Sequence, residues 1–163
     1  MKYFLITLII YVLLLAGCSS GVTGVDIEVN DSWVRAVSIM KTENTDESEI
    51  GSQVHLGDMS ANSAAYMVLV NNGNQADKLI GIASDVANTV ELHESKIEND
   101  VMKMQQVEFI EVPANGQVEL KPGGLHIMLI GLTKDLNEGD KVRLDLEFEV
   151  SGELPIEAEV RMP

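Results

Sequence analysis

The segment GGLHIML, Gly123 to Leu129, sets a histidine and a methionine two residues apart inside an apolar run. Residues two apart in a β-strand point to the same side, so His126 and Met128 should share a face while Ile127 points the other way. An imidazole nitrogen beside a thioether sulfur could hold a soft metal ion. A core strand with one incidental histidine would have the same pattern, and this segment alone does not choose between the two.

A second histidine and a second methionine pair lie upstream, and the chain has only three histidines in all. In TVELHES, alternation puts Val90 and Leu92 on an apolar face and His93 on the polar face. Met102 and Met104 follow in a polar stretch, where a methionine without a function is less expected than in a core. We therefore expect one donor set of four residues, His93, Met104, His126 and Met128. Met102 shares a face with Met104 and is a plausible additional donor.

These donor types favour monovalent copper over other metals. Thioethers select Cu(I), and imidazole accepts it readily. Zinc normally takes cysteine, histidine and carboxylate, whereas calcium and magnesium take oxygen. A blue-copper electron-transfer site needs a cysteine thiolate, and Cys18 is the only cysteine. The donors thus favour the binding of one Cu(I) ion over redox use of copper.

The four donors fit the spacing H-x10-M-x21-H-x-M, which is similar to the copper-binding signature of the PCuAC family of extracytoplasmic copper chaperones. The resemblance extends from Asp31 to about Val150, through DSWVRA, AAYMVLVNNGNQADKLIGIAS, VELHE, VELKPGGLHIMLIGL and LNEGDKVRLDLEFE. It implies a cupredoxin-like β-sandwich that holds one Cu(I) at an exposed end. It also implies delivery of copper to the copper-centre subunit of respiratory cytochrome oxidase, with Sco-type copper carriers as partners.

The segment 38–62 departs from that family, in which the corresponding connection is usually short. It is polar and acidic, without sustained periodicity, and a solvated acidic loop is the favoured interpretation. The insertion also contains Met40, His55 and Met59. His55 and Met59 are therefore candidate additional metal donors, and a second copper ion in this loop is the alternative.

The elements that must position the donors are strands. KVRLDLEFEV alternates apolar and charged residues, so that Val142, Leu144, Leu146, Phe148 and Val150 share one face. Similar segments and turn signals give seven or eight short strands and no convincing helix. The fold class predicted is all-β, an antiparallel Greek-key sandwich of cupredoxin-like or immunoglobulin-like type.

Three further residues have structural predictions of their own. Gly123 and Gly124 should let the backbone turn tightly before the strand that carries His126. Trp33, the only tryptophan, could pack in the core or beside the site, and the core is favoured.

The amino-terminal segment predicts export and a lipid anchor. Lys2 precedes an apolar run from Phe4 to Ala16, which is shorter than the roughly 20 residues that a bilayer-spanning helix needs. LAGC, ending at Cys18, resembles the lipobox of bacterial lipoproteins, in which the cysteine is acylated after cleavage. We expect a signal peptide at 1–17, a lipidated tether at 18–24 and a copper-binding sandwich domain at 25–163. The anchor would hold it at the outer face of the cytoplasmic membrane or in the periplasm.

Charge and motif content argue against other classes of function. The formal net charge of −15 repels nucleic acid. We find no nucleophile motif beside a histidine and no paired carboxylates, so an enzyme is not expected. A cell-surface copper-sequestration protein, or a metal-free lipoprotein that binds a protein partner, are the alternatives. Because histidines titrate near neutral pH, Cu(I) affinity should fall below about pH 6.5.

Overall fold

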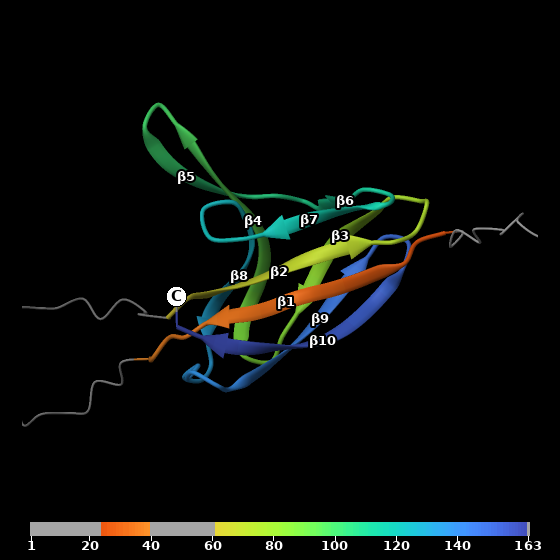
Figure 1. Ribbon diagram of the computed structural model, residues 1–163. Helices are drawn as coiled ribbons and strands as arrows, with labels where there is room; N and C mark the ends of the chain where they lie inside the picture. Colours follow the sequence, from red (N-terminus) through yellow and green to blue (C-terminus); the bar gives the residue numbers. More distant parts are fainter. Residues whose placement is uncertain (1–23, 40–60, 163) are drawn as a thin grey trace, which may run out of the picture.

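The computed structural model describes residues 24–39 and 61–162, and within these ranges the regular elements are ten β-strands and no helix (Figure 1). The strands are β1 (Ile27–Arg35), β2 (Ser63–Asn71), β3 (Asp77–Ala83), β4 (Ala87–Glu98), β5 (Val101–Gln106), β6 (Ile110–Val112), β7 (Gly116–Leu120), β8 (Leu125–Leu132), β9 (Lys141–Phe148) and β10 (Gly152–Arg161). In these ranges, nothing helical is long and apolar enough to cross a membrane. Cys18, Met40, His55 and Met59 lie outside the described residues.

The strands hydrogen-bond in the order β5-β4-β8-β2-β1-β10-β9-β3-β6, and β7 pairs with β2 beside this path. Many neighbours are distant in sequence, so most pairings are crossovers rather than simple hairpins. All pairs are antiparallel except β1 and β10, which run parallel through Trp33↔Glu159 to Arg35↔Arg161. The predicted antiparallel sandwich thus contains one parallel pair that the sequence did not indicate, because period-two alternation carries no information on strand direction.

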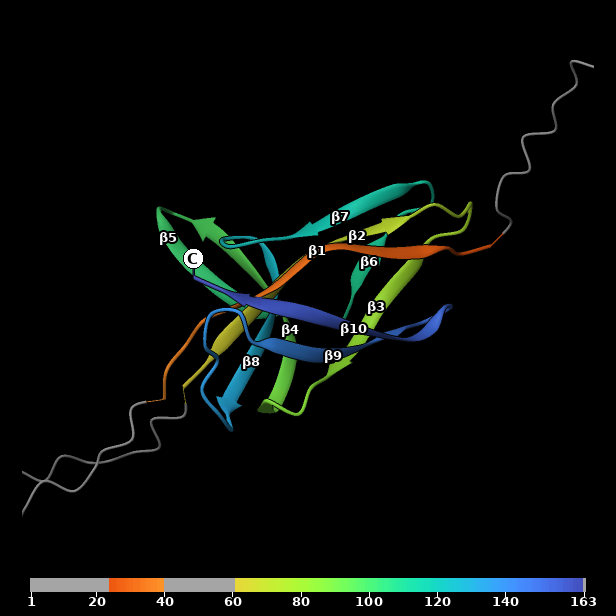
Figure 2. The ribbon, with the colours of Figure 1, turned by 60° about the horizontal axis from the view of Figure 1, so that its bottom comes forward.

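The sheet curls around one core, as the two views in Figures 1 and 2 show. Buried residues of β1, β2, β3, β4 and β6 to β10 form a single hydrophobic cluster. The alternation predicted for β9 is confirmed, since Val142, Leu144, Leu146 and Phe148 are buried. Val150 is an exception: it follows the end of β9 and is exposed in the turn before β10.

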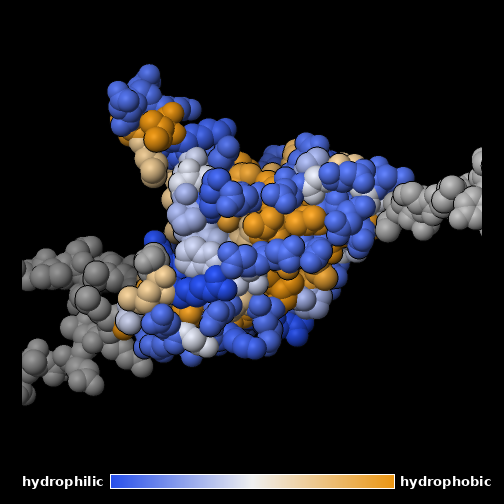
Figure 3. Space-filling view, viewed as in Figure 1, coloured by the Kyte–Doolittle hydropathy of each residue, from blue (hydrophilic) through white to orange (hydrophobic). Residues whose placement is uncertain are grey.

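The hairpin of β4 and β5 extends away from the body of the domain (Figure 1). We call its outer part, Ser95–Met104, the hairpin arm. Figure 3 shows apolar surface near its tip among hydrophilic side chains. Ile97, Val101, Met102 and Met104 are all more than half exposed there.

The count of ten strands exceeds the seven or eight expected, for two reasons. β6 has only three residues, too few for a periodic pattern to be detected. β5 is exposed at every position and so lacks the apolar alternation of a strand packed on a core. What defines β5 is its hydrogen bonding to β4 along the hairpin arm.

Candidate metal centre

The four predicted donors lie on three neighbouring strands, β5, β4 and β8, on the same side of the sheet. His93 of β4 is directly opposite His126 of β8. On β8, Met128 follows His126 by one period and is opposite Glu91. On β5, Met104 is opposite Ser95, which follows His93 by one period of β4. The sheet thus joins residues 33 positions apart in the chain, since antiparallel pairs share a face when directly opposite.

A tight turn and one hydrogen bond hold the His126 ring. Gly123 has φ of +78°, a backbone conformation that favours glycine, as expected for a turn before the strand. Gly124 has an ordinary backbone, so the requirement predicted for it is not found. Its carbonyl oxygen accepts a hydrogen bond of 3.0 Å from Nδ1 of His126 and another of 3.0 Å from the backbone N–H of Ser95. A carbonyl can only accept, so Nδ1 of His126 carries the hydrogen and Nε2 keeps a lone pair.

The His93 ring is held at its other nitrogen. Nε2 of His93 lies 2.7 Å from the Oε2 atom of Glu91, two residues earlier on the same face. Nδ1 of His93 is buried and has no hydrogen-bond partner among the described residues. A buried polar atom without a partner costs on the order of 1–3 kcal/mol, so its presence calls for an explanation.

The two imidazoles are close enough to bind one ion. Their ring centres are 5.8 Å apart and the ring planes are inclined by 56°. With metal–nitrogen bonds of about 2.0 Å, two imidazoles on one ion would have ring centres up to roughly 6 Å apart. The observed ring-centre distance therefore lies within the range that one shared metal ion would allow.

The two methionines differ in how the structure places them. Met128 is half-buried beside the histidines on the body of the domain. Met104 lies on the hairpin arm, on the other side of the histidine pair, and its residue is 53% exposed. Met102, opposite Ile97, lies farther out on the arm and is 63% exposed. The structure thus brings together His93, His126 and Met128, and puts the two methionines of β5 on a projecting element.

Aromatic rings continue the site toward β1. The Trp33 and Tyr66 rings have centres 4.5 Å apart, and the Tyr66 and His126 rings have centres 6.4 Å apart. Trp33 is half-buried on this face, because Val34 takes the core position of β1. The core position favoured for Trp33 is therefore wrong, and its ring contacts Tyr66, which in turn neighbours His126. Burial raises the pKa of Tyr66, against an opposing effect of the Arg35 charge.

The described residues do not form a metal site from histidine, cysteine and carboxylate side chains alone. Within the described ranges, no group of three or more histidine, cysteine, aspartate or glutamate side chains is arranged to hold a metal ion. The Glu91–His93–His126 set is thus not a ready zinc-type or calcium-type site. A complete ligand set here would need the thioether sulfurs, which bind soft ions.

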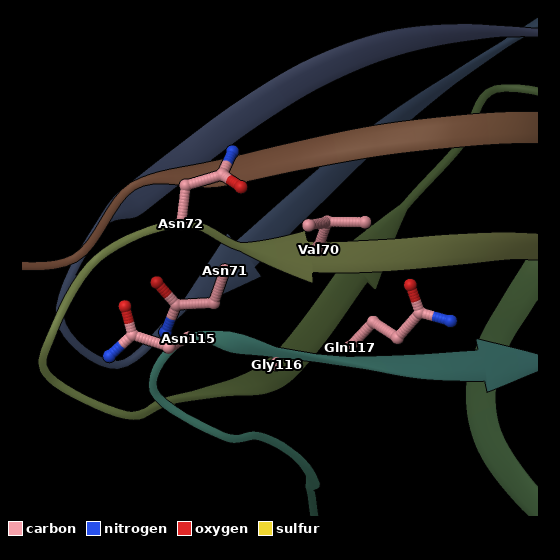
Figure 4. Close-up of a pocket in the computed structure, with 6 residues that line it drawn as sticks. All are labelled: Val70, Asn71, Asn72, Asn115, Gly116 and Gln117. Atoms are coloured by element: carbon pink, nitrogen blue, oxygen red, sulfur yellow. The ribbon is translucent and has the colours of Figure 1, made fainter.

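A polar pocket lies at the other end of β2, away from the histidines (Figure 4). Its lining is mostly amide side chains, and none of the predicted donors belongs to it. The lining residues are Val70, Asn71, Asn72, Asn115, Gly116 and Gln117.

Sequence reasoning missed Glu91 as a residue of the site. The signal was available, because Glu91 and His93 are two residues apart in a predicted strand and so share a face. Cys18, His55 and Met59 lie outside the described residues, so their predicted roles remain predictions.

Comparison with known proteins gives one family and two curated relatives. The model of a family described as "Putative lipoprotein LpqE-like" matches residues 27–160. An uncharacterized protein, RP573 of Rickettsia prowazekii, is 36% identical over 55% of this chain and 50% of its own length. "Putative lipoprotein Lxx21020" of Leifsonia xyli is 32% identical over 63% of this chain and 62% of its own length. The chain therefore matches only half to three fifths of each of these relatives.

Solved structures of similar fold are PCuAC domains and a related copper protein. The copper-bound PCuAC domain of PmoF2 has a TM-score of 0.61 and 26% identity, covering 86% of this chain and 97% of that domain. The Cu(I) form of DR1885 from Deinococcus radiodurans has a TM-score of 0.56 and 26% identity, covering 92% of this chain and 85% of that chain. The predicted all-β, cupredoxin-like fold and the resemblance to PCuAC domains are confirmed.

Proposed function

Because the chain belongs to the LpqE-like family, whose description is that of lipoproteins, we propose that it is an exported, lipid-anchored copper chaperone. Its cargo is one Cu(I) ion, and its ligands are His93, Met104, His126 and Met128. The protein binds and hands over the ion and performs no catalysis. Two similar structures, the copper-bound PCuAC domain of PmoF2 and Cu(I)-DR1885, support the choice of metal.

The observation that carries this proposal is the pair of facing histidines with complementary hydrogen bonds. His93 and His126 lie opposite one another on adjacent strands, with ring centres 5.8 Å apart. In each ring one nitrogen contacts a protein oxygen, and the other has no partner within residues 24–39 and 61–162. Incidental histidines in a core would be expected to satisfy both nitrogens or to face solvent.

The thioether sulfurs determine which oxidation state of copper the site prefers. Met128 beside the histidines and Met104 on the hairpin arm would give a set of two nitrogens and two sulfurs, all neutral. Soft thioethers favour Cu(I). A neutral set without a thiolate avoids oxidation to a disulfide outside the cytoplasm and allows release to a partner.

Delivery to the copper-centre subunit of respiratory cytochrome oxidase, together with Sco-type carriers, is the specific role we propose. It rests on the resemblance of the donor spacing to the PCuAC signature. The lipid anchor at Cys18 would keep the protein at the outer face of the cytoplasmic membrane or in the periplasm. His55 and Met59 in the acidic insertion are candidate donors for a second copper ion.

Competition with a chromophoric Cu(I) chelator tests the metal site. The experiment uses the full chain in detergent with Cys18→Ser, so that the only thiol cannot bind copper. We expect the protein to withdraw one equivalent of Cu(I) from bicinchoninate. X-ray absorption should then report both nitrogen and sulfur neighbours. A protein that leaves the chelator complex intact would exclude copper binding and favour the metal-free lipoprotein.

A deletion strain tests the purpose of binding. Loss of oxidase assembly at low copper, restored by added copper, supports delivery. Copper sensitivity with a normal oxidase would instead favour sequestration at the cell surface.

A further inference from the structure

We infer that Glu91 is a positioning residue that makes Nδ1 the copper-binding nitrogen of His93. This inference rests on the proposed function and specifies which atoms of the site act. The contact of 2.7 Å between Oε2 of Glu91 and Nε2 of His93 is its starting point.

The contact determines where the hydrogen of the His93 ring lies. An ionised carboxylate has no hydrogen to donate, so Nε2 of His93 must be the donor. In the neutral ring, Nδ1 then keeps its lone pair. A half-turn of the ring would bring a carbon atom beside Glu91 and lose the bond, so Glu91 restrains both the tautomer and the orientation of the ring.

The surroundings of Nδ1 indicate that its lone pair is reserved for a ligand. Nδ1 is buried and has no partner among the described residues. The ring faces the imidazole of His126, whose Nε2 is likewise left free by the bond from Nδ1 to Gly124. The two rings therefore bind through different nitrogens, Nδ1 in His93 and Nε2 in His126.

Glu91 has the position of a supporting group rather than of a ligand. It shares its face with His93 and lies opposite Met128, so it sits between donors of two strands. It does not belong to any group of three or more histidine, cysteine, aspartate or glutamate side chains that could hold a metal ion in the described part of the chain. Carboxylates that accept a hydrogen bond from a metal-binding histidine orient the ring and raise its basicity.

The same strand supplies a matched control in Glu94. Glu94 points to the opposite face of β4 and pairs with Lys96, with a contact of 2.7 Å. The side chains of Glu91 and Glu94 are equally exposed, at 27%. Substitutions at the two positions therefore remove the same charge with similar burial, but only one of them touches His93.

The test compares Glu91→Leu, Glu91→Gln and Glu94→Leu in the full chain with Cys18→Ser. In the metal-free protein, two-bond ¹H–¹⁵N correlation spectra should report hydrogen on Nε2 of His93. Glu91→Leu should shift this ring toward a mixture of tautomers and lower Cu(I) affinity by about tenfold or more in chelator competition. Glu91→Gln keeps an acceptor oxygen and should retain the tautomer and most of the affinity. Glu94→Leu should change neither.

The outcomes separate this inference from the proposed function. If the unsubstituted protein takes no Cu(I) from the chelator, the copper function fails, and the spectra still decide whether Glu91 sets the tautomer. If it binds Cu(I) but Glu91→Leu has the same tautomer and affinity, only the role of Glu91 is overturned. Equal losses in Glu91→Leu and Glu94→Leu would also overturn it, since they would indicate a general effect of charge.

Discussion

The two ends of the sandwich treat buried polar groups in opposite ways. At one end, the buried polar side chains of Asp77 and Asn71 each make several hydrogen bonds. At the end that includes His93, a buried nitrogen has none among the described residues. Both ends belong to the same sheet, so we ascribe the difference in hydrogen bonding to the different roles of these residues.

Asp77 is an example of a buried charge with a structural role. Its carboxylate accepts hydrogen bonds from the backbone N–H groups of Lys78, Val150 and Ser151, at 2.7, 2.9 and 2.9 Å. The Ser151 hydroxyl donates to it as well. These bonds tie the start of β3 to the turn between β9 and β10. Asn71 connects nearby segments in the same way, accepting from Gly73 and donating to Gln75.

At the histidine end, by contrast, the polar side-chain atoms have fewer hydrogen-bond partners. His93 and His126 each use one nitrogen in a hydrogen bond within the protein, and the other nitrogen of each ring has no partner in the part of the chain that the structure describes. The only other buried side-chain nitrogen in the described ranges without a partner, Nε of Arg35, lies on a strand that also borders this face. Hydrogen-bonded polar groups thus characterise the structural end, and nitrogens without a partner among the described residues characterise the end where we propose that copper binds.

Asp77→Ala should give the largest effect on stability and no effect on copper. It removes the shared acceptor of three part-buried backbone N–H groups. We expect a loss of about 2–4 kcal/mol in the free energy of unfolding, measured by urea denaturation. Asp145→Ala, which breaks only a surface ion pair with Arg143, should cost less than about 1 kcal/mol. A loss of Cu(I) affinity in folded Asp77→Ala protein would contradict the separation of the two ends.

His126→Ala should have the converse effect. Removal of one of the two imidazoles should lower Cu(I) affinity by roughly 100-fold or more, about 2.8 kcal/mol. His126 is only 4% exposed, so we also expect a stability loss of about 1–2 kcal/mol. Chelator competition and urea denaturation measure the two effects separately. An unchanged affinity would remove His126 from the ligand set.

Met104→Leu should lower affinity without affecting the fold. Because Met104 is exposed on the hairpin arm, the free energy of unfolding should change by less than about 0.5 kcal/mol. Loss of its sulfur should lower Cu(I) affinity by roughly tenfold, about 1.4 kcal/mol. Met102→Leu, on the same face of the same strand, is the matched control and should have little effect. If Met102→Leu gives the larger loss, the ligand of β5 is Met102.

Acid should weaken the Asp77 end by a smaller amount. Burial alone would raise the pKa of Asp77, but the hydrogen bonds from Ser151, Val150 and Lys78 together hold it below its usual value. Its contribution to stability is therefore present above the ordinary aspartate pKa of about 3.9 and is lost as pH falls through the lower, folded value. Stability measured from pH 5 to pH 2 should fall less steeply in Asp77→Asn than in the unsubstituted protein. Identical slopes would contradict this role.

The sequence predicted the features of the fold that depend on alternation within one strand. The core faces of β8 and β9, and the shared face of His126 and Met128, follow from the period of two. It did not predict the parallel pairing of β1 with β10 or the bonds of Asp77 to the β9–β10 turn. Those depend on contacts between distant segments, which no local pattern contains.

The site shows the same division between local features, which the sequence predicted, and long-range features, which it did not. Donor types and spacing led to His93, Met104, His126 and Met128, and the structure puts the two histidines directly opposite one another on adjacent strands. Alternation within β4 could have indicated Glu91, but not that it would contact Nε2 rather than solvent. Met104 lies on a projecting arm because β5 extends away from the body of the domain, and no local sequence pattern indicates this.

The pairing of His93 with His126 also gives a structural meaning to the spacing of the four donors in the sequence. One residue between His126 and Met128 is a single strand period, and ten residues between His93 and Met104 are the length of a hairpin that sets Met104 opposite Ser95. A slip of one residue between β4 and β8 would turn Leu92 toward the metal face and His93 toward the core. The spacing motif thus reflects the strand register, and an insertion or deletion that keeps all four proposed ligands in the chain could still separate them in the fold.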